Sequence, residues 1–182
     1  ETIPHTDGTL HHSVVAKFPI AGPDGAPLLI GGMAIDVTEE KRAEQALRDS
    51  EEKFRLLSDT APALIWLLDP DGQCVFINRQ FLDFAGATFD EISGTKWRLL
   101  LHPDDAPMYI DGITAAQRER TAFQHRVRAR RRDGQWRWLD SFAQPLYGAE
   151  GEYLGHVGIS PDITVAVEAE EAIRASQAAV VA

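Results

Sequence analysis

The beginning of this chain repeats near its end without a gap. Residues 7–51 align with residues 133–177 at a constant offset of 126 residues, and 14 of these 45 positions are identical. The longest shared motif pairs Asp36-Val37-Thr38 with Asp162-Ile163-Thr164, and both copies continue into a charged segment. Shared turn residues would match only at scattered places, whereas a gapless register of this length indicates two copies of one structural unit.

The repeat divides the chain into four parts. We expect residues 1–37 to be the C-terminal strands of a preceding unit and residues 38–62 to be a linker helix. Residues 63–164 then form one complete unit, and residues 165–182 begin the next linker helix. Because an isolated hairpin is only marginally stable, residues 1–37 are expected either to pair with another chain or to be poorly ordered.

The linker segment has the character of a dimer helix. Residues 38–60 are rich in charge and free of glycine and proline. Thr38 is a candidate N-cap, and Pro62 should end the helix, since the residue before a proline avoids the helical region. Apolar and small residues recur at the a/d spacing of a coiled coil, which predicts a dimer seam of Ala43, Leu47, Ser50, Phe54 and Leu57. We therefore expect a homodimer through the linker helices; the alternative is a surface helix packed on its own domain.

The complete unit alternates strands, helices and strands. Residues 64–69 and 73–78 predict two strands around a Pro-Asp-Gly turn, and residues 79–117 predict short helices. Residues 123–132, 135–146 and 152–160 predict three longer strands. This order favours an α+β fold in which a five-stranded antiparallel sheet carries helices on one face, flanked by coiled-coil-like linker helices.

The inner face of the strand at residues 135–146 has two alternatives. Either Leu139, Ser141 and Ala143 point inward and leave room for a ligand, or Trp138, Asp140 and Phe142 do so and close the interior.

Several motifs in this unit resemble one family in their order and spacing. Asn78 to Phe81, Phe84-Ala85-Gly86 and Asp90 to Gly94 resemble the early helices of PAS domains. Trp97 with His102-Pro103-Asp104-Asp105, and the closing Asp162-Ile163-Thr164, are similar to the PAS subgroup with a HPDD stretch and a C-terminal DIT. The resemblance covers residues 52–175, and residues 1–37 match the end of the same pattern.

The resemblance implies a sensory or docking module of a multidomain bacterial signalling protein, of the histidine kinase or cyclic-di-GMP enzyme type. Such a module senses a small molecule and passes the signal through its linker helices to neighbouring signalling domains. The alternative is a ligand-free dimerisation or spacer scaffold. The fragment is expected to be non-catalytic, because no nucleophile, base or metal set converges in the sequence and no phosphate-binding glycine loop is present.

The large side chains of the complete unit are candidates for the lining of a pocket or for a packed core. They are Trp66, Phe81, Trp97, Met108, Tyr109, Phe123 and Trp138. A small organic ligand fits this expectation, although its identity stays unknown.

Two cofactors of the family find little support in the residues. A flavin–cysteine adduct needs a cysteine in the helix after Asn78, and the single cysteine, Cys74, lies in the preceding strand as a structural thiol. Haem would need an axial ligand in the helix that begins near Asp105, which offers Met108 but no histidine. His102 to Asp105 instead indicate a helix start with acidic residues in the first turn. Adjacent His11 and His12 point to opposite faces of a strand, so no metal site is expected.

Charge and hydropathy limit the partners. The net charge of −10 argues against nucleic acid, and Arg126, Arg128, Arg130 and Arg132 indicate a solvated sheet face that pairs with acidic linker residues. No apolar run is long enough to span a bilayer and no signal peptide is evident, so we expect a cytoplasmic location. The parent protein could still be anchored in a membrane elsewhere.

Asp162 and Thr164, mirrored by Asp36 and Thr38, form the predicted signal joint. Each pair stands where a strand hands over to a linker helix, so its hydrogen bonds should set the exit direction of that helix.

Overall fold

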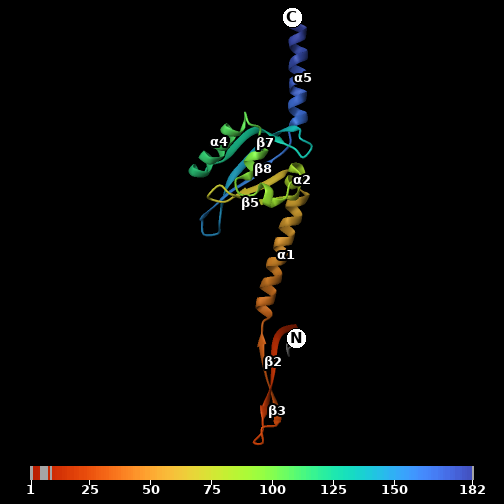
Figure 1. Ribbon diagram of the computed structural model, residues 1–182, viewed down its shortest axis with the longest axis vertical. Helices are drawn as coiled ribbons and strands as arrows, with labels where there is room; N and C mark the ends of the chain where they lie inside the picture. The colour runs from red at the N-terminus through yellow and green to blue at the C-terminus, as the bar shows by residue number, and fades with distance from the viewer. Residues whose placement is uncertain (1, 5–7, 9, 182) are drawn as a thin grey trace. The chain divides into compact units, whose positions relative to one another are not determined.

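A computed structural model describes residues 2–4, 8 and 10–181 of the chain (Figure 1). The chain divides into two compact units, residues 1–54 and residues 55–182. The boundary falls inside the predicted linker segment. Among the described residues, no helix is long and apolar enough to cross a membrane.

The second unit contains the predicted five-stranded antiparallel sheet, with strand order β5-β4-β8-β7-β6. Its strands are β4 (Leu64–Leu68), β5 (Cys74–Ile77), β6 (Phe123–Arg130), β7 (Trp136–Tyr147) and β8 (Tyr153–Ser160). The first and the last strand of this sheet in the sequence, β4 and β8, are neighbours. Leu64 lies opposite Ser160, and Trp66 lies opposite Gly158. The α+β class is thereby confirmed.

Helices between β5 and β6 supply the other half of the core. They are α2 (Arg79–Ala85), α3 (Phe89–Ile92), the 3₁₀ helix η1 (Lys96–Leu100) and α4 (Ala106–Glu119). On β7, Leu139, Ser141 and Ala143 are almost completely buried, whereas Phe142 is exposed. This decides the alternative left open by the sequence, in favour of the smaller inner set.

The first unit is a β-hairpin with a short third strand, followed by a helix. It comprises β1 (Thr2–Pro4), β2 (Leu10–Ala21), β3 (Pro27–Asp36) and most of α1 (Thr38–Thr60). The β2–β3 pair leaves large apolar side chains exposed along both strands, among them Val14, Phe18, Leu28, Ile30 and Met33. The hairpin therefore has no hydrophobic core of its own within the described residues.

The linker helices begin where the repeat predicts. Helix α1 starts at Thr38 and α5 (Thr164–Val181) starts at Thr164, one repeat length later. On α1 the seam positions Leu47, Phe54 and Leu57 are about 60% exposed, at 62%, 58% and 62%. Ala43 and Ser50 are also exposed. Pairing of these helices between two chains stays a prediction.

Candidate functional site

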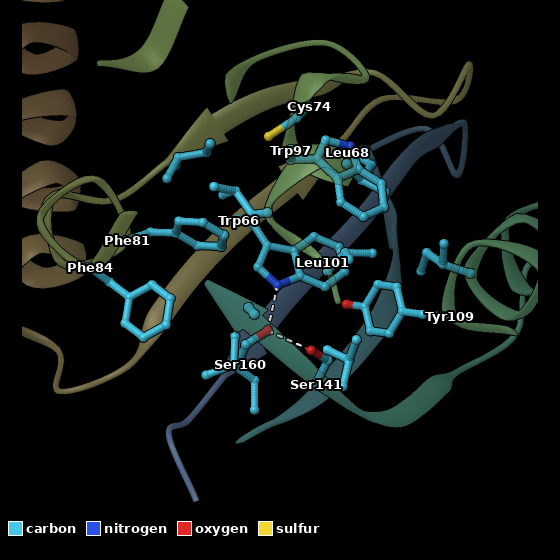
Figure 2. Close-up of a pocket in the computed structure, with 16 residues that line it drawn as sticks. Trp66, Leu68, Cys74, Phe81, Phe84, Trp97, Leu101, Tyr109, Ser141 and Ser160 are labelled. Atoms are coloured by element: carbon cyan, nitrogen blue, oxygen red, sulfur yellow. Dashed lines mark hydrogen bonds between the residues drawn. The ribbon is translucent and has the colours of Figure 1, made fainter. Parts of the chain in front are cut away.

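A small, mostly apolar cavity lies between the sheet and the helices of the second unit (Figure 2). Its volume is about 40 Å³. A buried water molecule needs a cavity of roughly 10–15 Å³, so this cavity holds a few water molecules. Pockets for drug-sized ligands are much larger, at roughly 300–1,000 Å³. Its walls come from all five strands, β4 to β8, from α2 and α4, and from η1 with the Leu101 that follows it.

Four polar groups meet at one side of this cavity. The indole nitrogen of Trp66 donates to Ser160 Oγ at 2.9 Å, and the hydroxyls of Ser160 and Ser141 lie 2.8 Å apart. The hydroxyl of Tyr109 points toward the same place (Figure 2). Burial raises the pKa of Tyr109 to about 12, partly opposed by the neighbouring Ser141, so the phenol stays neutral.

A donor count shows what this cluster offers. Trp66, Ser160, Ser141 and Tyr109 each bring one polar hydrogen. The two hydrogen bonds among them use one hydrogen each, so two hydroxyl hydrogens stay available. Any occupant of the cavity would therefore meet up to two O–H donors in mostly apolar surroundings.

The predicted lining residues divide into three groups. Trp66, Phe81, Trp97 and Tyr109 line the cavity. Phe123 is buried beside it, with its ring centroid 5.1 Å from that of Tyr109.

Two of the predicted lining residues lie elsewhere. Met108 is 67% exposed, because the inward face of α4 carries Tyr109 and Ile113, four residues apart, and leaves the neighbouring position outside. Trp138 lies on the opposite face of β7 from Leu139, with the guanidinium of Arg128 5.3 Å from its ring centroid. The prediction was wrong for both residues.

The donor set of the cavity does not fit haem or a reactive flavin site. Met108, the residue through which haem ligation stayed open, lies outside it. Cys74 does line the cavity, but burial raises the pKa of its thiol to about 12, which removes the thiolate needed for ligation or adduct formation. In the part of the chain that the structure describes, no cluster of His, Cys, Asp and Glu is suited to a metal ion.

The joint between the sheet and α5 is a closed set of hydrogen bonds. The carboxylate of Asp162 accepts the backbone N–H of Thr164 at 2.9 Å and pairs with Arg137 at 2.8 Å. Thr164 Oγ accepts the backbone N–H of Trp138 on β7 at 2.8 Å, and the Trp138 carbonyl accepts from Ile163. Burial raises the pKa of Asp162, but the hydrogen bonds from Thr164 and Arg137 outweigh it and lower the pKa overall.

The joint at α1 repeats these contacts at an offset of 126 residues. Asp36 accepts the N–H of Thr38 at 2.9 Å, and Thr38 Oγ accepts the N–H of His12 at 2.8 Å. The His12 carbonyl accepts from Val37, and His11 takes the place of Arg137 beside the carboxylate, at 2.6 Å. Hydrogen bonds from Thr38, with the neighbouring His11, hold the pKa of Asp36 well below its usual range.

The roles within each pair differ from the predicted ones. We expected Thr38 to cap its helix, but Asp36 caps it, and the threonine hydroxyl ties the first helical turn to the neighbouring strand. The carboxylate of Asp36 stands two residues before the first helical N–H and can reach it, as in an Asx turn.

The acidic residues before α4 also differ from expectation. Asp105 occupies the N-cap position but makes no side-chain cap bond. It binds Arg128 through two guanidinium contacts of 2.8 and 2.7 Å and accepts the Arg128 backbone N–H at 3.0 Å. A bidentate charged pair is stronger than one helix-end N–H, and it lowers the pKa of Asp105. Arg128 thus pairs with this loop and not with a linker residue.

Asn78 belongs to the family motif, but the sequence did not predict it as a site residue. It is 1% exposed, and its amide donates to the carbonyls of Ser58 in α1 and Ala63. Its carbonyl oxygen accepts the N–H of Ile65 in β4 and of Phe81 in α2. Asn78 therefore fastens the incoming helix to the domain. The chain contains one asparagine, which was the only sequence signal available.

These features define a class: a small α+β domain whose sheet and helices enclose a cavity and whose last strand leads into a helix joint. Residues 74–160, which lie in the second unit, match the family described as the PAS fold, and this unit is a PAS domain. PAS is a sensory fold without catalytic activity of its own.

Relatives of the chain include a signalling protein. The "Uncharacterized protein y4lL" of Sinorhizobium fredii is 31% identical over 148 residues, which cover 81% of this chain and 18% of that protein. The "Two-component sensor PprA" of Pseudomonas aeruginosa is 27% identical over 147 residues, covering 81% and 16%. This chain thus spans less than a fifth of either relative's length.

A solved structure of a sensory box histidine kinase/response regulator from Burkholderia thailandensis is also similar. It is 27% identical, with a TM-score of 0.54 over 70% of this chain and 97% of that chain. Together these matches place the chain among sensor modules of signalling proteins.

Proposed function

We propose that the second unit senses a small molecule in its cavity and passes the signal through the Asp162–Thr164 joint to α5. The observation that carries this proposal is the sharing of strands. Ser141 and Ser160 of the cavity lie on β7 and β8, and the joint is made by Trp138 of β7 and by Asp162, two residues after Ser160. An occupant that shifts either strand would therefore strain the hydrogen bonds of the joint.

The ligand that the cavity favours is small, neutral and largely apolar, with a hydrogen-bond acceptor. The hydroxyl hydrogens that the cluster leaves available supply the donor for that acceptor. Burial of a charged group beside these apolar walls would be costly. A ligand larger than a few atoms would need the cavity to widen.

The parent protein is proposed to be a multidomain signalling protein of the histidine kinase type, with a cyclic-di-GMP enzyme as the alternative. The two-component sensor and the sensory box histidine kinase among its relatives support this.

Native mass spectrometry tests the homodimer and the ligand in one sample. We expect a dimer carrying the added mass of a small organic molecule. Leu57→Ala should raise the dimer dissociation constant at least tenfold, because truncating a buried Leu costs ~2–5 kcal/mol. Leu56→Ala is the matched control, since Leu56 is equally exposed on α1 (64% against 62%) but lies off the seam. A wild-type monomer, or equal effects of both variants, would contradict the seam.

The relay is tested with Thr164→Val in the parent protein. Valine keeps the shape of threonine but leaves the N–H of Trp138 without its partner, which costs ~1–3 kcal/mol. A change of that size alters a two-state balance roughly 5–150-fold, so we expect the regulation of output to be lost while the protein stays folded. Thr114→Val, at an exposed position of α4, is the control. Unchanged regulation in Thr164→Val would reduce the joint to a helix cap.

A scaffold without a ligand is the second candidate. The small volume of the cavity favours it, because the interior is already nearly filled. Two results together would support the scaffold: a dimer of this chain at the bare polypeptide mass, and a parent protein whose output responds to no small molecule.

A further inference from the structure

We propose that β1, β2 and β3 are the last strands of a second PAS-like domain, and that the open edge of β3 receives a strand from a segment of the natural protein upstream of these residues. That strand carries a large aromatic side chain over Gly32. The proposal does not depend on the proposed function.

The described residues of the first unit's strands pair in the register of residues 128–164. Thr2 stands opposite His12 as Arg128 stands opposite Trp138, and the offset is 126 residues in each case. The turns match as well: Gly22 N–H donates to the Ala26 carbonyl at 2.8 Å, as Gly148 N–H donates to that of Glu152 at 2.9 Å. With the two joints, the match extends from the first strand to the helix.

The difference lies at the next edge of the sheet. In the second unit β8 has neighbours on both sides, β7 and β4. Its counterpart β3 pairs with β2 alone among the described strands. The exposed Leu29, Ile30 and Met33 lie along this open strand, which is the kind of edge that proteins otherwise cover or charge.

Glycine at one position indicates what covers that edge. A Cβ on Gly158 would collide with the indole of Trp66, the residue opposite it on β4. Glycine at position 158 thus makes room for an aromatic ring. Its counterpart Gly32 faces open space, since a Cβ there would meet nothing closer than 3.7 Å. The same hollow exists at Gly32, with no ring in it among the described residues.

A second copy of the chain is the less suitable occupant. The strand that would fit is the equivalent of β4, and β4 of the complete unit already has β5 on one side and β8 on the other. The repeat instead requires a β4-like strand about a hundred residues upstream of β3, in the place that Leu64–Leu68 hold relative to β8.

Gly32→Ala tests the proposal when it is made in two proteins: the chain of residues 1–182 and the natural protein that includes the preceding residues. We expect no loss of thermal stability in the shorter chain. In the longer protein we expect the transition of the upstream domain to fall by roughly 5 °C or more. Gly158→Ala serves as the positive control and should destabilise the second unit in both.

Hydrogen exchange supplies the second measurement. The outward amides of β3 should exchange at least a hundredfold more slowly in the longer protein than in residues 1–182. Equal exchange, or equal tolerance of Gly32→Ala in both proteins, would overturn the proposal. Protection that already appears in residues 1–182 and grows with protein concentration would also overturn it, because a second copy would then cover the edge.

Discussion

Replacing Asn78 with alanine should lower the free energy of unfolding of the second unit by ~3–5 kcal/mol, since each buried group left without its partner costs ~1–3 kcal/mol. The substitution removes four hydrogen bonds at once. It leaves the carbonyls of Ser58 and Ala63 and the N–H of Ile65 without the side chain they bind. Water reaches this position poorly, because Asn78 is 1% exposed. Urea denaturation followed by tryptophan fluorescence measures the loss.

Gln80→Ala is the matched control for Asn78→Ala. Gln80 also bridges α2 to the end of α1, through a 3.3 Å contact with the carbonyl of Asp59, but this contact is exposed to solvent. We expect its loss to cost no more than ~0.5 kcal/mol. If Asn78→Ala cost as little as Gln80→Ala, the hydrogen bonds of Asn78 would not be what holds α1 to the domain.

The Asn78 result also bears on signalling. Asn78 contacts the last turns of α1, β4 and α2 together, whereas Asp162 and Thr164 act at the start of α5. The buried amide of Asn78 thus holds the domain to α1, and the side chains of Asp162 and Thr164 hold it to α5. We expect a variant of any of these residues that still folds to alter the coupling between the two helices.

Gly155→Ala should destabilise the second unit by at least ~4 kcal/mol, because it adds a backbone collision to a strained conformation. Gly155 has a φ of +122°, in a region that side-chain-bearing residues rarely adopt. A Cβ there would run into the carbonyl oxygen of Leu68 and lie 2.9 Å from Asp69 Cα. Both obstacles are backbone at the end of β4, so no side chain can move aside. Thermal unfolding would show the loss, or the protein would fail to accumulate.

Gly151→Ala separates conformation from collision. Gly151 has a φ of +83° in the β7–β8 turn, but a Cβ there meets nothing within 4 Å. It should cost only the left-handed backbone penalty of about 1–2 kcal/mol. Equal losses for the two glycine variants would mean that β8 can shift away from β4, and the central pairing of the sheet would then be looser than the structure shows.

Local patterns in the sequence were sufficient for the order of elements. Alternation and turn residues such as Asp133-Gly134 predicted the strands, since a period of two and a reversal signal are properties of neighbouring residues. The gapless repeat located the two helix starts at Thr38 and Thr164 for the same reason. Family motifs spread over residues 78–164 indicated PAS, which the comparison confirms for residues 74–160.

Only the tertiary structure decided which face of each element is covered and which polar groups meet. Periodicity shows that Leu139, Ser141 and Ala143 share a face of β7, but only their burial in the folded domain makes that face the inner one. It likewise turns Met108 outward. Asp105 pairs with Arg128, which lies 23 residues later in the chain. Asn78 binds Ser58, which lies 20 residues earlier. Such contacts depend on the convergence of separate elements, and a local pattern carries no information about that convergence.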